Sequence, residues 1–364
     1  MHRFRMLQRE VDENEEESGE DENDSDEDYG YDPGVITEKE SQWNRDLQCL
    51  GLDLKSTSLG KTFLSGIGTC GVYGGANIGD DFFSTYSDSF AENPVYPVHP
   101  KCLDLFRLLV AHKSGTGATP VSVDGSWIPR SLDLDTGTLF AILDERSNRF
   151  NCLEMDYGDP EIDHNEQFWE SRQGEELFIA DPTLDDELVK GMILSVWHDA
   201  DNQPLTGNTA LFAKTEDSND LFAKLPFELL LNVISELEAS SLLSLLNASP
   251  HVHRALDSGS SLWLNCIGKS MPWFFELHEF LDNLTGSNDD GRGNASSNAD
   301  AFRDKSLRRF FVWANHITTP RVGQMGPFMC VANRRRIWDV CQQLVDPYLA
   351  QLQSPDAVIE DASE

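Results

Sequence analysis

The stretch Leu-Pro-Phe-Glu-Leu-Leu-Leu-Asn-Val-Ile-Ser-Glu-Leu at residues 225–237 decides how the middle of this chain folds. Pro226 suits the first turn of a helix, where its missing N–H costs no hydrogen bond. The apolar residues that follow recur at the spacing of one helical face, namely Leu229, Leu230, Val233, Ile234 and Leu237. The stretch therefore predicts a short amphipathic helix.

Two more short helices are predicted directly after it. Ser240 and Ser241 are capping residues before a run of leucines. Ser249 and Pro250 then supply an N-cap and a first helical residue, and Gly259 is expected to end the third helix. Helices this short and this rich in leucine cannot bury all their apolar surface against one another. We therefore expect a partner protein to cover the rest.

This pattern resembles the F-box. The resemblance is carried by Leu-Pro-x-Glu-Leu at 225–229, a branched residue four positions later, and the leucines and tryptophan that follow, namely Leu237, Leu242, Leu243, Leu245 and the pair Leu262-Trp263. F-box domains dock on the Skp adaptor of SCF ubiquitin ligases, so the resemblance implies an adaptor-binding module at residues 222–268. It implies that the adaptor-facing residues are Leu225, Pro226, Leu229, Val233, Leu237, Leu242, Leu245 and Trp263.

The later half of the module departs from the family pattern. Positions that are usually small hydrophobic or basic-aromatic hold Ala248, Ser249, His251 and His253, which favours weaker adaptor binding. Short segments elsewhere resemble filamentous-fungal F-box proteins: Tyr96-Pro97-Val98-His99, residues 167–171, Met271-Pro272-Trp273 and residues 333–338. The alternative is a leucine-rich helical hairpin inside an ordinary core, because apolar residues at helical spacing are usually core residues.

Composition limits the classes of partner. The 364 residues carry 28 basic and 63 acidic side chains, a formal net charge of −35. This charge argues against nucleic-acid binding, which needs a cationic surface, and against anionic membranes. Residues 10–28 alone hold thirteen acidic and no basic side chains, so residues 1–29 are expected to form a disordered acidic tail.

Other features favour a cytoplasmic or nuclear location. The acidic start offers no apolar segment of a secretory signal, and no apolar run approaches the ~18 residues of a membrane-spanning helix. The seven cysteines are odd in number and widely scattered, as expected for reduced thiols.

The fold class predicted for the whole chain is α+β. Residues 30–200 should form an α+β domain, with helices at 37–50, at 97–110 and after the capping residue Asp135, and with short strands or core segments at 177–180 and 192–197. A polar linker at 201–221 should precede the F-box-like module. Residues 269–352 should form a C-terminal helical region with a flexible insertion at 285–300, followed by a tail at 353–364.

Two groups of residues could carry chemistry. His99 and Cys102 have the spacing of zinc ligands, with Cys49, Cys70 or Cys152 to complete the set, but no Cys-x-x-Cys pair accompanies them. A core cysteine beside a surface histidine is the simpler interpretation, so neither metal nor cofactor is expected. Arg334-Arg335-Arg336 could grip an acidic or phosphorylated peptide, or could neutralise carboxylates within the protein.

No motif of an enzyme is present in the sequence. The sequence therefore predicts a non-catalytic subunit that holds the Skp adaptor, and through it cullin, and recruits an unidentified protein substrate. Two alternatives remain open: a scaffold that works with the adaptor outside a cullin ligase, and a plain protein-interaction module. An enzyme within residues 30–215 is a further alternative, without a motif to support it.

Overall fold

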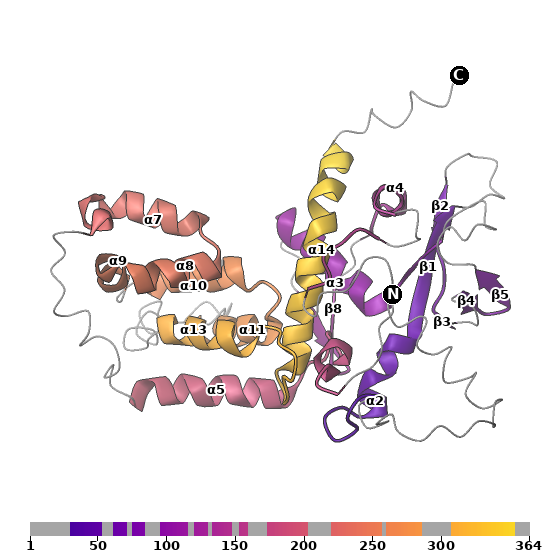
Figure 1. Cartoon of the computed structure of the whole chain (residues 1–364), viewed down its shortest axis with the longest axis horizontal. Helices are drawn as coiled ribbons and strands as arrows, with labels where there is room; N and C mark the ends of the chain where they lie inside the picture. Colours follow the sequence, from indigo (N-terminus) through magenta and orange to yellow (C-terminus); the bar gives the residue numbers. More distant parts are fainter. Residues whose placement is uncertain are drawn as a thin grey trace, which may run out of the picture. The chain divides into compact units, whose positions relative to one another are not determined.

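The structure is a computed structural model, and it describes residues 30–52, 61–70, 75–83, 95–115, 120–129, 133–147, 153–158, 173–202, 220–256, 260–285 and 307–353. The chain divides into two compact units (Figure 1). Unit 1 contains Met1–Asp185 and Pro320–Glu364, and unit 2 contains Asp186–Thr319. An antiparallel sheet in unit 1 and helices in both units confirm the α+β class.

The unit boundaries differ from the predicted ones in two places. The C-terminal helix α14, Met329–Gln353, was predicted to belong to a separate region at 269–352, but it lies in unit 1 with the N-terminal half of the chain. Helix α5, Glu187–Asn202, was predicted to lie in the domain at 30–200, but it belongs to unit 2. The acidic tail, most of the linker, the insertion after Thr285 and the C-terminal tail lie outside the described residues.

The sheet of unit 1 is built around one strand, β1, Asp46–Leu52. Its order is β2-β1-β3-β4-β5, and β6 also pairs with β1; every pairing is antiparallel. The other strands are short: β2 Thr62–Leu64, β3 Gly68–Cys70, β4 Ala76–Ile78, β5 Asp81–Phe83 and β6 Tyr96–Val98. A separate hairpin joins β7, Val121–Val123, to β8, Ser126–Ile128. Both residues at its turn have positive φ angles, 51° for Asp124 and 76° for Gly125.

Helices cover this unit, and α14 contacts most of them. Two short turns, α2 Glu38–Ser41 and η3 Gln42–Arg45, precede the sheet. They are followed by α3 Pro100–Lys113, α4 Thr136–Glu145 and the 3-10 helix η5 Glu176–Ile179. Helix α14 packs against α3, α4 and η5 (Figure 1). Asp135 caps α4, as predicted, by accepting from the Thr138 amide at 2.7 Å.

Two buried polar side chains of α14 hold the segment after η5 in place. Asn333 donates to the carbonyl oxygens of Phe178 and Ala180, at 3.3 and 2.7 Å. Arg334 is fully buried, and its guanidinium donates to the carbonyl oxygens of Pro182 at 2.5 Å and Leu184 at 2.9 Å. These bonds satisfy backbone groups in a segment without regular hydrogen bonding.

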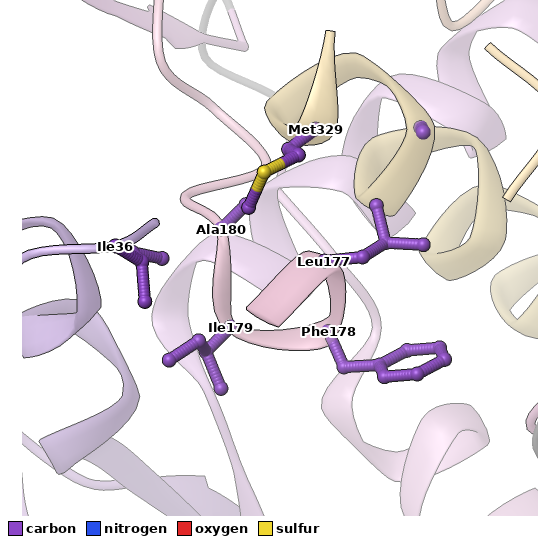
Figure 2. Close-up of a cluster of buried hydrophobic side chains, with 7 residues drawn as sticks. Ile36, Leu177, Phe178, Ile179, Ala180 and Met329 are labelled. Carbon is purple, nitrogen blue, oxygen red and sulfur yellow. The ribbon is translucent and has the colours of Figure 1, made fainter. Parts of the chain in front are cut away.

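An apolar cluster surrounds the same segment. It consists of Ile36, Leu177, Phe178, Ile179, Ala180, Met329 and Ala332, all buried. Figure 2 shows Leu177 directed toward α14, while the ring of Phe178 points away from Ile36. The cluster joins the first described residues of unit 1 to its last helix, which explains why α14 belongs here and not with the helices that precede it in sequence.

The described residues of unit 2 form helices. After α5 come the 3-10 helix η7 Leu221–Lys224 and then α7 Phe227–Glu236, α8 Ala239–Ala248, α9 Pro250–Ala255, α10 Ser260–Ser270, α11 Phe275–Thr285 and α13 Leu307–Ile317. Contacts join α8 to α9, α10 to α13, and α5 to both α11 and α13. Aromatic rings fill this core: Trp197 lies 5.5 Å from Phe280 and 5.4 Å from Phe310 between ring centroids.

Residues 37–50 were predicted to be a helix, and this is wrong, because only two short turns form before β1 begins at Asp46. The segments at 177–180 and 192–197 were predicted to be short strands or core segments. Residues 177–180 are a buried core segment at η5, and 192–197 lie in helix α5 with Ile193 and Trp197 buried. Residues 46–52 form a strand because they pair with β2, β3 and β6, and Leu47, Cys49 and Leu50 are buried in it.

Candidate functional site

The motif at 225–237 forms a helix with one buried face and one exposed face. Leu230 and Ile234 of α7 are buried, four residues apart. Leu229 and Val233 are each adjacent in sequence to one of these residues, about 100° around the helix axis, and their exposed fractions are 51% and 40%. Pro226 precedes the helix as its N-cap residue, and its carbonyl accepts from the amides of Leu229 and Leu230 at 3.1 Å.

Exposed apolar side chains continue to the N-terminal side of this helix. Phe227 is 50% exposed, Leu225 is 37% exposed and Leu221, on η7, is 73% exposed. We refer to Leu221, Leu225, Phe227, Leu229 and Val233 as the apolar set. A cluster of large apolar side chains left in water is costly in a monomer, and such surfaces usually mark a site of protein interaction.

Asp220 fixes the start of this region against α9. Its carboxylate caps η7 by accepting from the Phe222 amide at 3.0 Å. The second oxygen accepts from the Ser249 hydroxyl at 2.6 Å and the His251 amide at 3.1 Å. Burial acts to raise the pKa of Asp220, but the hydrogen bonds from Ser249 and the two amides outweigh it and lower the pKa. The ionised carboxylate therefore ties η7 to α9.

Ser249 also caps its own helix. Its hydroxyl oxygen accepts from the Val252 amide at 3.1 Å, and Pro250 is the first residue of α9. Both roles were predicted from the sequence and are confirmed.

The eight residues predicted to face the adaptor differ in their exposure to solvent. Leu225, Pro226, Leu229 and Val233 are exposed, while Leu237 and Leu245 are half-buried. Sequence reasoning missed two exposed members of the apolar set, Leu221 and Phe227. The spacing of four residues from 221 through 225 and 229 to 233 was the signal that could have identified Leu221.

Leu242 and Trp263 require a correction. Each is only 1% exposed, so neither side chain is presented to a partner on the surface as it stands. Trp263 donates from Nε1 to the Leu256 carbonyl at 2.9 Å, and its ring lies 5.4 Å from that of Phe311. Both residues hold the helices of unit 2 together, and we remove them from the docking surface.

The arginine run at 334–336 does not form a peptide-binding cluster. Arg334 is buried and bonded to backbone carbonyls, so its guanidinium is not available to a phosphate. Arg336 donates to the Asn333 side chain and to the Tyr157 carbonyl. Arg334 and Arg336 therefore organise unit 1.

The candidate zinc ligands that the structure describes, His99, Cys102 and Cys49, do not form a metal-binding group. Among the residues that the structure describes, no group of three or more histidine, cysteine or acidic side chains could hold a metal ion. His99 Nδ1 lies 2.8 Å from the Asp46 carbonyl oxygen, and the ring makes an edge contact with Trp43. Cys49 is buried, and burial raises the pKa of its thiol to about 12. Cys152 and the side chain of Cys70 lie outside the description.

Unit 1 contains a second feature, an apolar cavity of about 220 Å³. Side chains of α3, α4 and α14 form most of its wall, and His99, Cys102 and Arg336 contribute polar groups.

Within the part of the chain that the structure describes, no helix has both the length and the apolar character that a membrane crossing requires. Comparison with protein-family models, curated proteins and solved structures finds no match to this chain.

Proposed function

We propose that this chain is an F-box protein that binds the Skp adaptor and recruits a protein substrate to an SCF-type ubiquitin ligase. Its contribution is then proximity, because it holds the substrate near the charged E2 while other subunits carry out the covalent chemistry. The proposal rests on the resemblance of residues 222–268 to the F-box and on the exposure of the apolar set.

The single observation that carries the proposal is the orientation of the motif. If the leucine-rich stretch were an ordinary internal hairpin, its large apolar residues would be buried. Instead Leu229, Val233 and Phe227 are about half exposed, while Leu230 and Ile234 of the same helix are in the core. A helix that already packs one face and still exposes an apolar second face offers that face to a partner.

Affinity capture tests the proposal. The intact chain and a Leu229→Ala/Val233→Ala variant are expressed with a tag in fungal cells, and captured proteins are identified by mass spectrometry. We expect the adaptor and cullin with the intact chain and neither with the variant. A matched control is Leu188→Ala/Leu194→Ala, which removes two exposed leucines of α5 outside the apolar set.

The outcomes separate the alternatives. Capture of adaptor without cullin, with no protein longer-lived in the variant, indicates a scaffold outside the ligase. Equal capture of adaptor by the intact chain and the Leu229→Ala/Val233→Ala variant contradicts the proposed docking surface. Absence of adaptor from every capture contradicts the F-box assignment.

A further inference from the structure

The cavity of unit 1 lies among three helices that are far apart in the sequence. Helix α3 contributes Leu103 and Phe106 to its wall. Helix α4 contributes Leu139 and Leu143, and α14 contributes Ile337 among others. All five side chains are buried, so a molecule held between them is removed from water. Walls of this kind offer water few hydrogen bonds, and apolar cavities accept apolar molecules in its place.

The charged group at the wall is already engaged within the protein. Arg336 donates from Nε and Nη2 to the Asn333 side chain, and from Nη1 to the Tyr157 carbonyl at 3.1 Å. Its guanidinium carbon also lies 5.2 Å from the centre of the Phe178 ring. An anionic ligand would have to compete with these contacts while losing its own hydration, which is costly.

Other polar groups at the wall favour a neutral ligand for the same reason. His99 Nδ1 lies 2.8 Å from the Asp46 carbonyl oxygen. Burial raises the pKa of the Cys341 thiol, so this thiol is uncharged at neutral pH. A charged molecule would therefore lose more in hydration than the cavity returns, whereas a neutral apolar molecule gains by leaving water.

The volume of the cavity sets the size of the ligand. It measures about 220 Å³, compared with roughly 150 Å³ for an engineered apolar cavity in another protein that binds benzene. The ratio of these volumes gives room for about nine non-hydrogen atoms. Left empty, a cavity of this size deprives its lining atoms of dispersion contacts, so an occupant of matching size stabilises unit 1.

The kinds of side chain at the wall favour an aromatic ligand. Trp43, Phe106, Tyr157 and Phe178 all belong to the lining, and Met155 adds a thioether. Aromatic rings pack edge-to-face or offset against other rings, and sulfur interacts favourably with ring edges. A flat ring system can make these contacts, and a saturated ring of the same size cannot.

We propose that this cavity binds one neutral molecule of two fused aromatic rings, of the size of indole. The apolar walls supply the driving force, and the aromatic side chains select a flat ring system over a saturated one. This inference concerns unit 1 alone and does not depend on the proposed F-box function.

Titration calorimetry on the full chain tests the proposal with four probes that have the same number of non-hydrogen atoms. Indole is neutral and aromatic, cyclooctanol is neutral and saturated, benzoate is an anion, and benzamidine is a cation at neutral pH. We expect one indole per chain, bound at least ~10-fold more tightly than either ion because the ions must be desolvated. Indole should bind roughly 2- to 10-fold more tightly than cyclooctanol, the range of an aromatic pair contact.

Two variants that fill the cavity test the location of the site. Val340 and Leu344 line it on α14 and are half-buried. Val340→Trp and Leu344→Trp each add a large ring to the wall without changing any charge, and each should abolish indole binding. Val312→Trp, at an exposed site on α13 in unit 2, is the matched control and should bind indole like the parent.

Thermal unfolding shows which variants are folded and provides a second measure of binding. Saturating indole should raise the unfolding temperature of the parent and of Val312→Trp, and should leave that of the two filled variants unchanged.

Four results would overturn the proposal. They are the absence of saturable indole binding by the parent chain, benzoate or benzamidine binding as tightly as indole, cyclooctanol binding as tightly as indole, and retention of indole binding by a folded Val340→Trp or Leu344→Trp variant.

Discussion

Replacement of the buried Arg334 by methionine tests the account of unit 1. Methionine has a similar length and no charge, so Arg334→Met removes the hydrogen bonds to the carbonyls of Pro182 and Leu184 without a large change in volume. Hydrogen bonds that involve a charged group stabilise by about 1.5–3 kcal/mol each. The two carbonyls would remain buried without these donors, which adds to the loss.

Part of the loss is offset because the methionine packs in the space that the aliphatic part of the arginine side chain occupied. We expect the free energy of opening this segment to fall by about 3–5 kcal/mol. At 1.4 kcal/mol per factor of ten, this raises the population of the open segment on the order of 100- to 3,000-fold. The affected amides are those of Ala180, Leu184 and Asp185, which donate to Glu176, Asp181 and Gly125.

Hydrogen exchange followed by mass spectrometry measures this opening directly in peptides that cover residues 173–185. Arg45→Met is the control, because its ion pair with Glu38 is exposed on both sides, and such pairs contribute about 0–1 kcal/mol. Unchanged protection of residues 173–185 in Arg334→Met would refute the structural role of this arginine and reopen its assignment to ligand binding.

Three further predictions concern other parts of the chain. The pKa of the Asp220 carboxyl is lowered in the folded protein. Its contribution to stability is therefore complete at neutral pH and is lost as pH falls below about 4 through the folded-state pKa. Protection of the Phe222 amide from hydrogen exchange should fall in that range, and Asp220→Asn should remove this pH dependence. Deletion of residues 1–28 should leave the unfolding temperature nearly unchanged in calorimetry, since the segment has little apolar surface to bury; a drop of several degrees would show that it docks. Elemental analysis should find no stoichiometric zinc, and one zinc per chain that Cys102→Ser removes would contradict this.

Local features of the fold could be read from the sequence. Asp135 and Ser249 were identified as N-caps because a cap depends on the residue itself and the next three amides. Helices α3, α4 and α7 followed from local patterns for the same reason. The α+β class was right, but the segments predicted as possible strands lie in η5 and α5.

Long-range features could not be read in this way. Arg334 and Pro182 are 152 residues apart in sequence, and no local pattern indicates that α14 packs with η5. The boundary between the units was therefore misplaced. Strand β1 was missed because Trp43 and Leu47 have helical spacing. In the structure Leu47 pairs with Gly68 of β3, while Trp43 lies in η3 and its Nε1 donates to the Ile179 carbonyl.

Exposure agrees with only part of the predicted adaptor-facing set. Periodicity shows that residues share a face, but it does not show whether that face meets the core or a partner. Leu229 and Leu242 are both leucines at motif positions, yet the first is half exposed and the second is buried. Only the packing of the helices in unit 2 distinguishes them.

The most direct test of the central claim is the dissociation constant of the purified full chain for purified Skp adaptor, measured by calorimetry. Leu229→Ala/Val233→Ala should weaken binding by roughly 30- to 1,000-fold, the range of a hot spot worth ~2–4 kcal/mol. Both side chains are exposed, so the variant should keep the unfolding temperature of the parent. Leu188→Ala/Leu194→Ala should bind like the parent. An unchanged dissociation constant in the folded Leu229→Ala/Val233→Ala variant would contradict the claim that this surface receives the adaptor.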